Sequence, residues 1–296
     1  MNSDLFKTIA LIGKHKNPDI VIPLLNLAAY LTDQGASVVL DSLTATHISS
    51  SKYPVLTLEE IGKQADLAIV LGGDGTMLNI ARALVLFGVP LIGINQGRLG
   101  FLTDLTADTM HETLNAMLAG QFVVENRMLL TAEVTRNGES IFKELAFNDV
   151  VLHRGISSGM IELEVHINDE YVYSLRSDGL IIATPTGSTA YALSSGGPIL
   201  HPGLNLMTLV PICPHTLSNR PIVIGADATI EIKVHFTTEI KIYTDSHSWF
   251  DLGEHDRVFV RRCPDTIKLL HPVHHSYYRM LREKLGWSSI LQKNSR

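Results

Sequence analysis

The chain has 296 residues, of which 45% are hydrophobic and 18% are charged, a composition typical of a globular protein long enough for two domains of ordinary size. Its formal net charge of −6 argues against nucleic acid or an anionic membrane surface as a partner. Cys213 and Cys263 form no CxxC pair, which excludes a zinc ribbon and a thioredoxin-type redox motif. The apolar runs are too short for a signal peptide or a membrane span, so we expect a cytoplasmic protein.

The first 120 residues alternate short apolar runs with segments of helical periodicity. The short runs are apolar at successive positions, which is typical of parallel strands covered by helices on both faces. Thr57 followed by Glu60 fits a capping box at the start of a helix. We therefore predict a doubly wound α/β domain over residues 1–120, with strands at 7–13, 36–40, 66–71 and 89–95 and helices at 21–34, 57–63, 77–87 and 109–119.

The pattern changes after residue 120, where short strands predominate. Asn137-Gly138 offers the positive φ angles of a tight turn and predicts a hairpin between strands at 128–135 and 141–152. We predict a β-rich, antiparallel, sandwich-like domain over residues 121–274, followed by a helix within residues 275–296 that packs back on the first domain. Its other strands are expected at 160–167, 171–175, 180–183, 222–224, 229–236, 239–244, 258–261 and 266–270, and the helix at 277–285.

The strongest motif is GGDGT at residues 72–76, which lies between a buried strand and a helix. Open α/β sheets bind ligands at this edge, where glycines let the backbone approach a phosphate and the helix start offers unpaired N–H groups. Phosphates would repel Asp74 unless it had a chemical role, such as accepting a proton from a hydroxyl nucleophile or holding Mg²⁺. The alternative is a tight turn in which Asp74 caps the helix. No GxxxxGK[ST] sequence occurs, which excludes a P-loop enzyme.

Two further segments carry groups that could bind a nucleotide. Residues 184–191 place five hydroxyl side chains in one loop, and Tyr191 adds a face for stacking a base. Asn148 and Asp149 interrupt an apolar strand, where neighbouring side chains point to opposite faces unless the strand bulges or ends. There, an amide and a carboxylate could contact an adenine edge and a ribose diol. The alternatives are an ordinary Ser/Thr-rich loop and a surface-facing strand edge.

Three histidines, His271, His274 and His275, precede the C-terminal helix. Because no carboxylate or cysteine stands at ligand spacing beside them, we expect a solvated surface cluster. We predict no metal ligand among the residues of the chain.

Together these segments resemble the NAD kinases, the ATP-dependent enzymes that convert NAD to NADP. GGDGT is shared with diacylglycerol and sphingosine kinases, and a related GGDG occurs in phosphofructokinases. The full set is specific to the NAD kinases: GGDGTMLNIAR at 72–82, GINQGRLGFLTD at 93–104, the Asn148-Asp149 pair and DGLIIATPTGSTAYALSSGGP at 178–198. The tail ending KLGW at 284–287 looks like that of the proteobacterial branch.

The resemblance implies a homodimer or homotetramer that binds NAD in a cleft between the two domains and uses ATP with a divalent metal, Mg²⁺ or Mn²⁺. It implies that Asp74 deprotonates the 2′-hydroxyl of the adenosine ribose and that Gly75 approaches the diphosphate. Asn148 and Asp149, the latter a Glu in many relatives, would contact adenine and ribose. The other residues implied for NAD are Arg176 at the edge of the pocket, Asp178 toward the nicotinamide, His247 where close relatives often carry Gln, and Thr189, Ala190, Tyr191, Ala192, Leu193 and Ser194 around the adenine.

Two other functions stay open at this point. A lipid kinase would share GGDGT, but residues 184–198 and the lack of a membrane-binding amphipathic segment distinguish this chain from that class. A non-catalytic NAD(P)-binding regulator would keep the fold, although the intact Asp74 and its neighbouring glycines disfavour it. The sequence also leaves open whether polyphosphate replaces ATP, whether NADH is accepted, whether NADPH inhibits, and whether the oligomer is a dimer or a tetramer.

Overall fold

The computed structural model describes residues 5–15, 17–48, 52–95, 97, 100–103, 105–106, 110–155, 159–216, 218–236 and 239–287. The chain forms two compact units. Unit 1 comprises Met1–Asn126 and Ile267–Arg296, and unit 2 comprises Arg127–Thr266. Two long strands, β7 (Phe122–Arg136) and β18 (Arg257–Pro272), carry the chain from one unit to the other.

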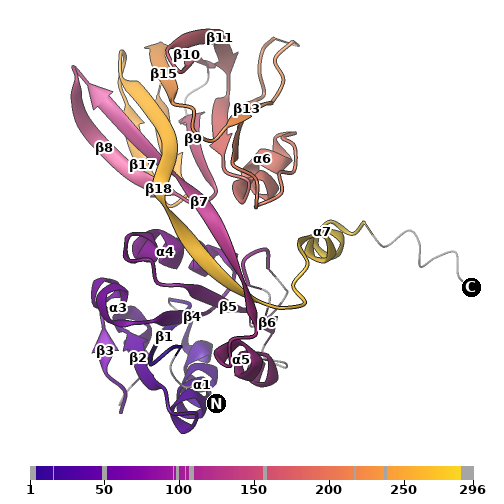
Figure 1. The fold of residues 1–296 in the computed structure, drawn as a ribbon. Helices are drawn as coiled ribbons and strands as arrows, with labels where there is room; N and C mark the ends of the chain where they lie inside the picture. Colours follow the sequence, from indigo (N-terminus) through magenta and orange to yellow (C-terminus); the bar gives the residue numbers. More distant parts are fainter. Residues whose placement is uncertain are drawn as a thin grey trace, which may run out of the picture. The chain divides into compact units, whose positions relative to one another are not determined.

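Unit 1 is built on a parallel sheet with the strand order β3-β2-β1-β4-β5 (Figure 1). The chain runs outward from β1 to β3 and then returns to β4, and doubly wound sheets place their ligand sites at such a switch point. β6 (Leu105–Thr106) pairs with β5, as does Leu269 near the end of β18. From β1 to β5 the strands span Thr8–Gly13, Ser37–Asp41, Val55–Leu56, Leu67–Leu71 and Leu91–Asn95.

Both faces of this sheet are buried. Ile9 and Leu11 of β1 belong to one core cluster with helices α1 and α5, whereas Ala10 and Ile12 point to the opposite face and are buried as well. This arrangement confirms the predicted doubly wound α/β fold. The helices of unit 1 are α1 (Val21–Asp33), α2 (Ser42–Ala45), α3 (Leu58–Gln64), α4 (Asp74–Leu84), α5 (Met110–Leu118) and α7 (Tyr277–Leu285).

Two helix starts show how local sequence sets the boundaries. The capping box of α3 is present as predicted, with the Thr57 N–H donating to Glu60 Oε2 at 2.8 Å and the Glu60 N–H donating to Thr57 Oγ1 at 3.3 Å. Helix α4 begins at Asp74, three residues before the predicted start at Met77. The apolar pattern begins only at Met77, because the first turn of α4 is polar and carries the GGDGT residues themselves.

Unit 2 contains two sheets that enclose one core. One has the order β11-β10-β15-β18, to which β7 and β8 add, and the other has the order β14-β13-β12-β9-β16-β17. Leu130 of β7 and Leu152 of β9, which lie in different sheets, belong to the same buried cluster. This confirms the predicted β-rich, sandwich-like part of the fold. The strands from β8 to β17 span Glu139–Ala146, Asp149–Arg154, Ile161–Ile167, Glu170–Ser177, Gly179–Ala183, Leu206–Ile212, Ile222–Gly225, Ile230–Phe236, Ile240–Thr244 and Ser248–Leu252.

The prediction of a single strand at 141–152 was wrong. β8 ends at Ala146 in one sheet, and β9 begins at Asp149 in the other. The break is invisible in the apolar pattern because Phe147, which lies at it, is itself fully buried. Conversely, the strands predicted at 258–261 and 266–270 are parts of the continuous β18.

Two strands of the second sheet were not predicted. β13 contains Pro211, which lacks an N–H and is unusual inside a strand, yet it pairs with Leu180 in regular register. β17 (Ser248–Leu252) is five residues long and exposes alternate residues, as a strand with one covered face does, and the prediction missed it. Within the described ranges, no helix is both long and apolar enough to cross a membrane.

Candidate active site

The GGDGT segment forms the turn between β4 and α4. Gly73 is the N-cap of α4 with an extended backbone, and Asp74 is the first residue of the helix. The turn therefore lies at the carboxyl end of β4, next to the switch point of the sheet. Gly75, in the first turn of the helix, is exposed, and a Cβ built at this position would meet no atom within 4 Å. The sequence thus places a carboxylate and an open stretch of backbone together at the start of a helix.

The carboxylate of Asp74 is fixed by the segment that follows β5. Its Oδ2 accepts the backbone N–H of Phe101 at 2.8 Å, and its Oδ1 accepts that of Leu102 at 3.0 Å. The hydroxyl of Thr103 lies 3.4 Å from Oδ1. A Cβ at Gly100 would collide with this carboxylate, so the close approach requires glycine. These contacts give the GINQGRLGFLTD motif a structural role, although residues 96, 98, 99 and 104 lie outside the described ranges.

In unit 2, Asn148 and Asp149 lie at the point where the chain passes from β8 to β9. The carboxylate of Asp245 accepts three successive backbone N–H groups there, those of Phe147 at 2.9 Å, Asn148 at 2.7 Å and Asp149 at 3.2 Å. Asp245 lies in the turn between β16 and β17, with a φ of 50°. The two polar side chains therefore stand at a strand end, which is one of the two arrangements in which both can contact a ligand.

The carbonyl side of the same segment is held by the loop after β12. The Thr184 hydroxyl donates to the carbonyl of Phe147 at 2.7 Å, and the Thr184 N–H donates to that of Asn148 at 2.9 Å. Gly187 lies so close that a Cβ there would collide with the backbone of Asn148. Both the N–H and the carbonyl groups of this segment are thus hydrogen-bonded within unit 2. The side chains of Asn148 and Asp149 are therefore the groups of the segment that could bind a ligand.

Asp149 is an unusual acid because its side chain is almost completely buried, with 3% of the residue exposed. Burial, and then the negative charge of Asp245, raise the pKa of Asp149 to about 7. Both causes act in the same direction, since each disfavours the charged form of the carboxyl group.

Tyr191 and Asp178 belong to the same electrostatic neighbourhood. The pKa of the Tyr191 phenol is raised, first by burial and then by the charges of Cys213, Asp149 and Asp178. Tyr191 nevertheless keeps 39% of its surface exposed, as a stacking face requires. Asp178 forms an ion pair with Arg154, whose Nε lies 2.8 Å from Asp178 Oδ1. The fold of unit 2 therefore gathers three of the predicted site residues, Asp149, Asp178 and Tyr191.

The other predicted residues divide into exposed and buried groups. His247 lies in the β16–β17 turn beside Asp245, and it is exposed like Arg176 and Ser194. Ala192 is fully buried, in the same core cluster as Ile181, and exposes neither its side chain nor its backbone. Partly buried positions in and around helix α6 (Tyr191–Ser194) are Thr189, Ala190 and Leu193.

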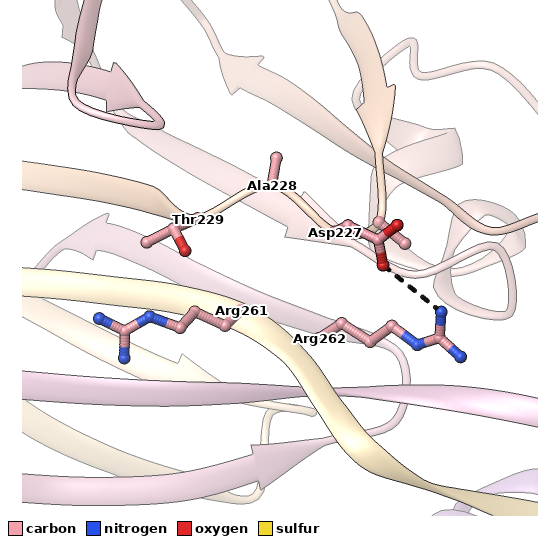
Figure 2. Close-up of a pocket in the computed structure, with 6 residues that line it drawn as sticks. Asp227, Ala228, Thr229, Arg261 and Arg262 are labelled. Atoms are coloured by element: carbon pink, nitrogen blue, oxygen red, sulfur yellow. Dashed lines mark ion pairs between the residues drawn. The ribbon is translucent and has the colours of Figure 1, made fainter.

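Sequence reasoning missed Asp245 and the role of residues 100–103. Asp245 is 96 residues from Asp149, and no local spacing reveals a contact over that distance. The turn that holds Asp245 gave no signal either, because β17, the strand after it, was not predicted. A separate surface hollow in unit 2, of about 280 Å³, is lined by no predicted site residue (Figure 2). It contains two guanidinium groups, and its lining residues are Ala226, Asp227, Ala228, Thr229, Arg261 and Arg262.

The expected solvated histidine cluster needs correction. His271 is 2% exposed, and its Nε2 lies 3.0 Å from Oε2 of Glu125. The carboxylate that the sequence did not show at ligand spacing comes from β7, 146 residues away. His274 is exposed as expected.

Comparison with known proteins identifies the family. The ATP-NAD kinase N-terminal domain profile matches residues 9–122, and the ATP-NAD kinase C-terminal domain profile matches residues 147–272. The chain belongs to the ATP-NAD kinase family. It is 93% identical over 296 residues, covering 100% of both chains, to a protein named NAD kinase from Nitrosomonas europaea. It is 64% identical over 288 residues, covering 97% of this chain and 98% of the relative, to the NAD kinase of Nitrosospira multiformis.

Solved structures of the ATP-NAD kinase family share the fold. A yeast NADH kinase complexed with NADH has a TM-score of 0.88 at 25% sequence identity and covers 99% of this chain and 89% of its own. An NAD kinase from Archaeoglobus fulgidus in complex with ATP has a TM-score of 0.73 at 23% identity. The match covers 94% of this chain and 98% of that structure's chain. The predicted family and enzyme class, a phosphotransferase of the NAD kinase type, are confirmed, and the lipid-kinase alternative is set aside.

We expect Asp149→Asn to raise the free energy of unfolding at pH 8 and to change it little at pH 4. An acid whose pKa is higher in the folded chain binds more protons when folded, so the wild-type protein loses stability as the pH rises from about 4 to about 7. For a pKa of about 7 the loss reaches up to about 4 kcal/mol. Urea unfolding of both proteins across this pH range measures the difference in the free energy of unfolding. A difference that is the same at every pH would contradict the raised pKa of Asp149.

We expect Asp245→Asn to lower the free energy of unfolding by about 1.5–3 kcal/mol, because the amide loses one of the oxygens that accept the three N–H groups. It also removes the charge beside Asp149, so the pH-dependent loss of stability moves to lower pH. Asp251→Asn is the matched control, since Asp251 is an exposed partner of Lys241 at 2.7 Å and its loss should cost under about 1 kcal/mol. Equal losses in the two variants would contradict the role of Asp245.

Proposed function

We propose that Asp74 is the base with which this member of the family deprotonates the 2′-hydroxyl of the adenosine ribose of NAD, so that ATP phosphorylates that oxygen and NADP forms. The observation that carries the proposal is the fixed carboxylate at the start of α4, held by the N–H groups of Phe101 and Leu102 at 2.8 and 3.0 Å. Phosphates bound at this edge of a doubly wound sheet would repel a carboxylate. A role as proton acceptor explains why one is present.

The proposed step balances as a simple transfer. The ribose oxygen gives its proton to Asp74 and forms a bond to the γ-phosphorus, while the bond from that phosphorus to the β–γ bridging oxygen breaks and ADP leaves. Within the described residues, Asp74 Oδ2 accepts a single hydrogen bond, so a lone pair is available for the proton. A positioned base supplies about 10²–10⁴ of the rate, and alignment of the reacting groups and screening of charge supply most of the rest.

We propose phosphate contacts for residues of unit 1 and NAD contacts for residues of unit 2, each argued from its own unit. Gly75 offers an exposed helix start to the diphosphate. In unit 2, Asn148 and Asp149 would contact adenine and ribose, and Tyr191 would stack on the base. Asp178 would lie toward the nicotinamide. These assignments are supported by the engaged backbone of the 147–149 segment and by the shared electrostatic neighbourhood of Asp149, Asp178 and Tyr191.

A divalent ion, Mg²⁺ or Mn²⁺, is proposed to enter with ATP. The free lone pair of Asp74 Oδ2 serves the proton transfer, so we propose that the ion is held by substrate phosphates and water. When bound, such an ion screens the charge of the phosphoryl group. The chain's own contribution is to hold the Asp74 carboxylate and the open backbone at Gly75 in fixed positions.

We also propose a cytoplasmic homo-oligomer. The free cysteines Cys213 and Cys263 support a reducing compartment. The oligomer is supported only by the resemblance to the family.

The activity is tested by incubating the purified chain with NAD, ATP and Mg²⁺ and measuring NADP with an NADP-specific dehydrogenase. A parallel reaction with polyphosphate in place of ATP identifies the donor. We expect NADP formation with at least one donor. No NADP above the blank, together with NAD binding in calorimetry, would instead favour a non-catalytic NAD-binding protein.

Asp74→Asn should lower the rate of NADP formation by about 10²–10⁴ while NAD binding changes by less than about threefold, because the amide is similar in shape but a poor base. Asp66→Asn is the matched control. The Asp66 carboxylate also accepts two backbone N–H groups, those of Lys7 at 2.9 Å and Thr8 at 2.8 Å, near the opposite end of β4. We expect Asp66→Asn to retain turnover, and near-normal turnover by folded Asp74→Asn would exclude Asp74 as the base.

A further inference from the structure

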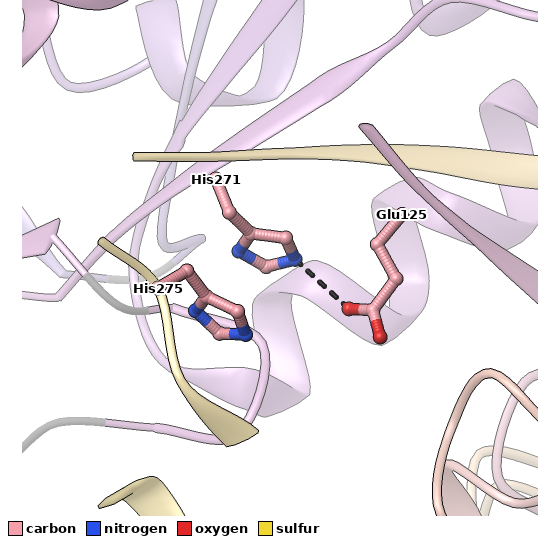
Figure 3. Close-up of side chains that lie close together, drawn as sticks. All are labelled: Glu125, His271 and His275. Atoms are coloured by element: carbon pink, nitrogen blue, oxygen red, sulfur yellow. Dashed lines mark hydrogen bonds and ion pairs between the residues drawn. The ribbon is translucent and has the colours of Figure 1, made fainter. Parts of the chain in front are cut away.

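Two histidines and a glutamate converge inside unit 1, and none of the three is assigned above to a substrate. Glu125 comes from β7, His271 from the end of β18, and His275 from the turn that leads into α7 (Figure 3). Their candidate ligand atoms all lie within 4.8 Å of one another. His271 is 2% exposed, and Glu125 and His275 are partly buried.

The three side chains already lie close together. The imidazole rings of His271 and His275 are stacked, with centroids 4.0 Å apart and planes inclined by 20°. His271 Nε2 and Glu125 Oε2 are 3.0 Å apart, as Figure 3 shows. A tetrahedral ion with bonds of 2.0–2.2 Å keeps its ligand atoms about 3.3 Å apart. The His271–Glu125 pair lies near this spacing, and the His275 ring, which is stacked on His271, would have to turn to direct a nitrogen lone pair at the ion.

The donor set indicates the class of ion. Two imidazole nitrogens and one carboxylate oxygen suit a divalent transition ion such as Zn²⁺, whereas Mg²⁺ and Ca²⁺ prefer oxygen ligands alone. We propose that Glu125, His271 and His275 form a binding site for a Zn²⁺-type ion, with water in the remaining position. The proposal concerns residues that take no part in the proposed phosphoryl transfer and does not rest on that function.

The position of the cluster suggests a structural effect. Glu125 stands two residues before unit 2 begins at Arg127, and His271 follows the return of the chain to unit 1 at Ile267. An ion bound here would join the departing and returning segments, which are 146 residues apart in sequence. Because the unfolded chain cannot hold these three groups together, binding would stabilise the folded protein.

Cobalt is the probe for the experiment, because Co²⁺ replaces Zn²⁺ at such sites. Its visible absorption is strong when the ion has only about four ligands, so the spectrum reports the coordination number. The full chain without a histidine tag is freed of metal with EDTA and titrated with Co²⁺ at about pH 7.5, where imidazole is neutral. We expect one ion per chain, a visible band that Zn²⁺ abolishes by displacement, and a higher unfolding temperature. At 100 times the dissociation constant, the folded-to-unfolded ratio should rise about 100-fold.

Three variants locate the site. His275→Gln and Glu125→Gln should weaken Co²⁺ binding by at least about tenfold and remove the visible band, since each loses one ligand. His274→Gln is the matched control, because His274 is adjacent in sequence but exposed and outside the cluster. Circular dichroism without metal confirms that each variant is folded. Absence of binding by the wild-type chain, or equal binding by wild type and His275→Gln, would overturn the proposal and leave His271 and Glu125 as a hydrogen-bonded pair only.

Discussion

A single carboxylate holds the point at which the chain of unit 2 changes sheets. β8 ends at Ala146 and β9 begins at Asp149, so the N–H groups between them lack the regular partners of a strand. Each buried N–H left without an acceptor would cost about 1–3 kcal/mol. Asp245 accepts three of them, at 2.7–3.2 Å, from the neighbouring β16–β17 turn. The sandwich and the placement of Asn148 and Asp149 both depend on this interaction.

The same interaction has an electrostatic cost at Asp149. A second carboxyl group is buried beside Asp245, and its pKa is raised to about 7 by burial and by that neighbouring charge. Asp149 therefore changes its protonation near neutral pH, and it is able to donate a hydrogen bond when protonated and to accept one when ionised. The chemistry of this carboxyl group thus depends on its surroundings as much as on the residue type.

Unit 1 uses a related arrangement at Asp74. Backbone N–H groups from the segment after β5 fix the carboxylate, and the absence of a side chain at Gly100 allows the approach. The formal net charge of −6 is therefore a poor guide to the ligands of this family, whose substrates are anions. Helix starts, glycine backbone and a substrate-bound cation are able to hold phosphates locally without a basic surface.

The sequence by itself determined the local features: the α/β and β-rich halves, the capping box of Thr57, and the family, because strand and helix periods and the GGDGT motif depend on neighbouring residues. Only the tertiary structure decided where the strand at 141–152 breaks, since the buried Phe147 keeps the pattern apolar through the break. It alone brought Asp245 to the 147–149 segment and Glu125 to His271, contacts between residues 96–98 and 146 positions apart. Such contacts arise when sheets pair and pack, and the spacing of residues along the chain does not encode them in a form that can be read locally.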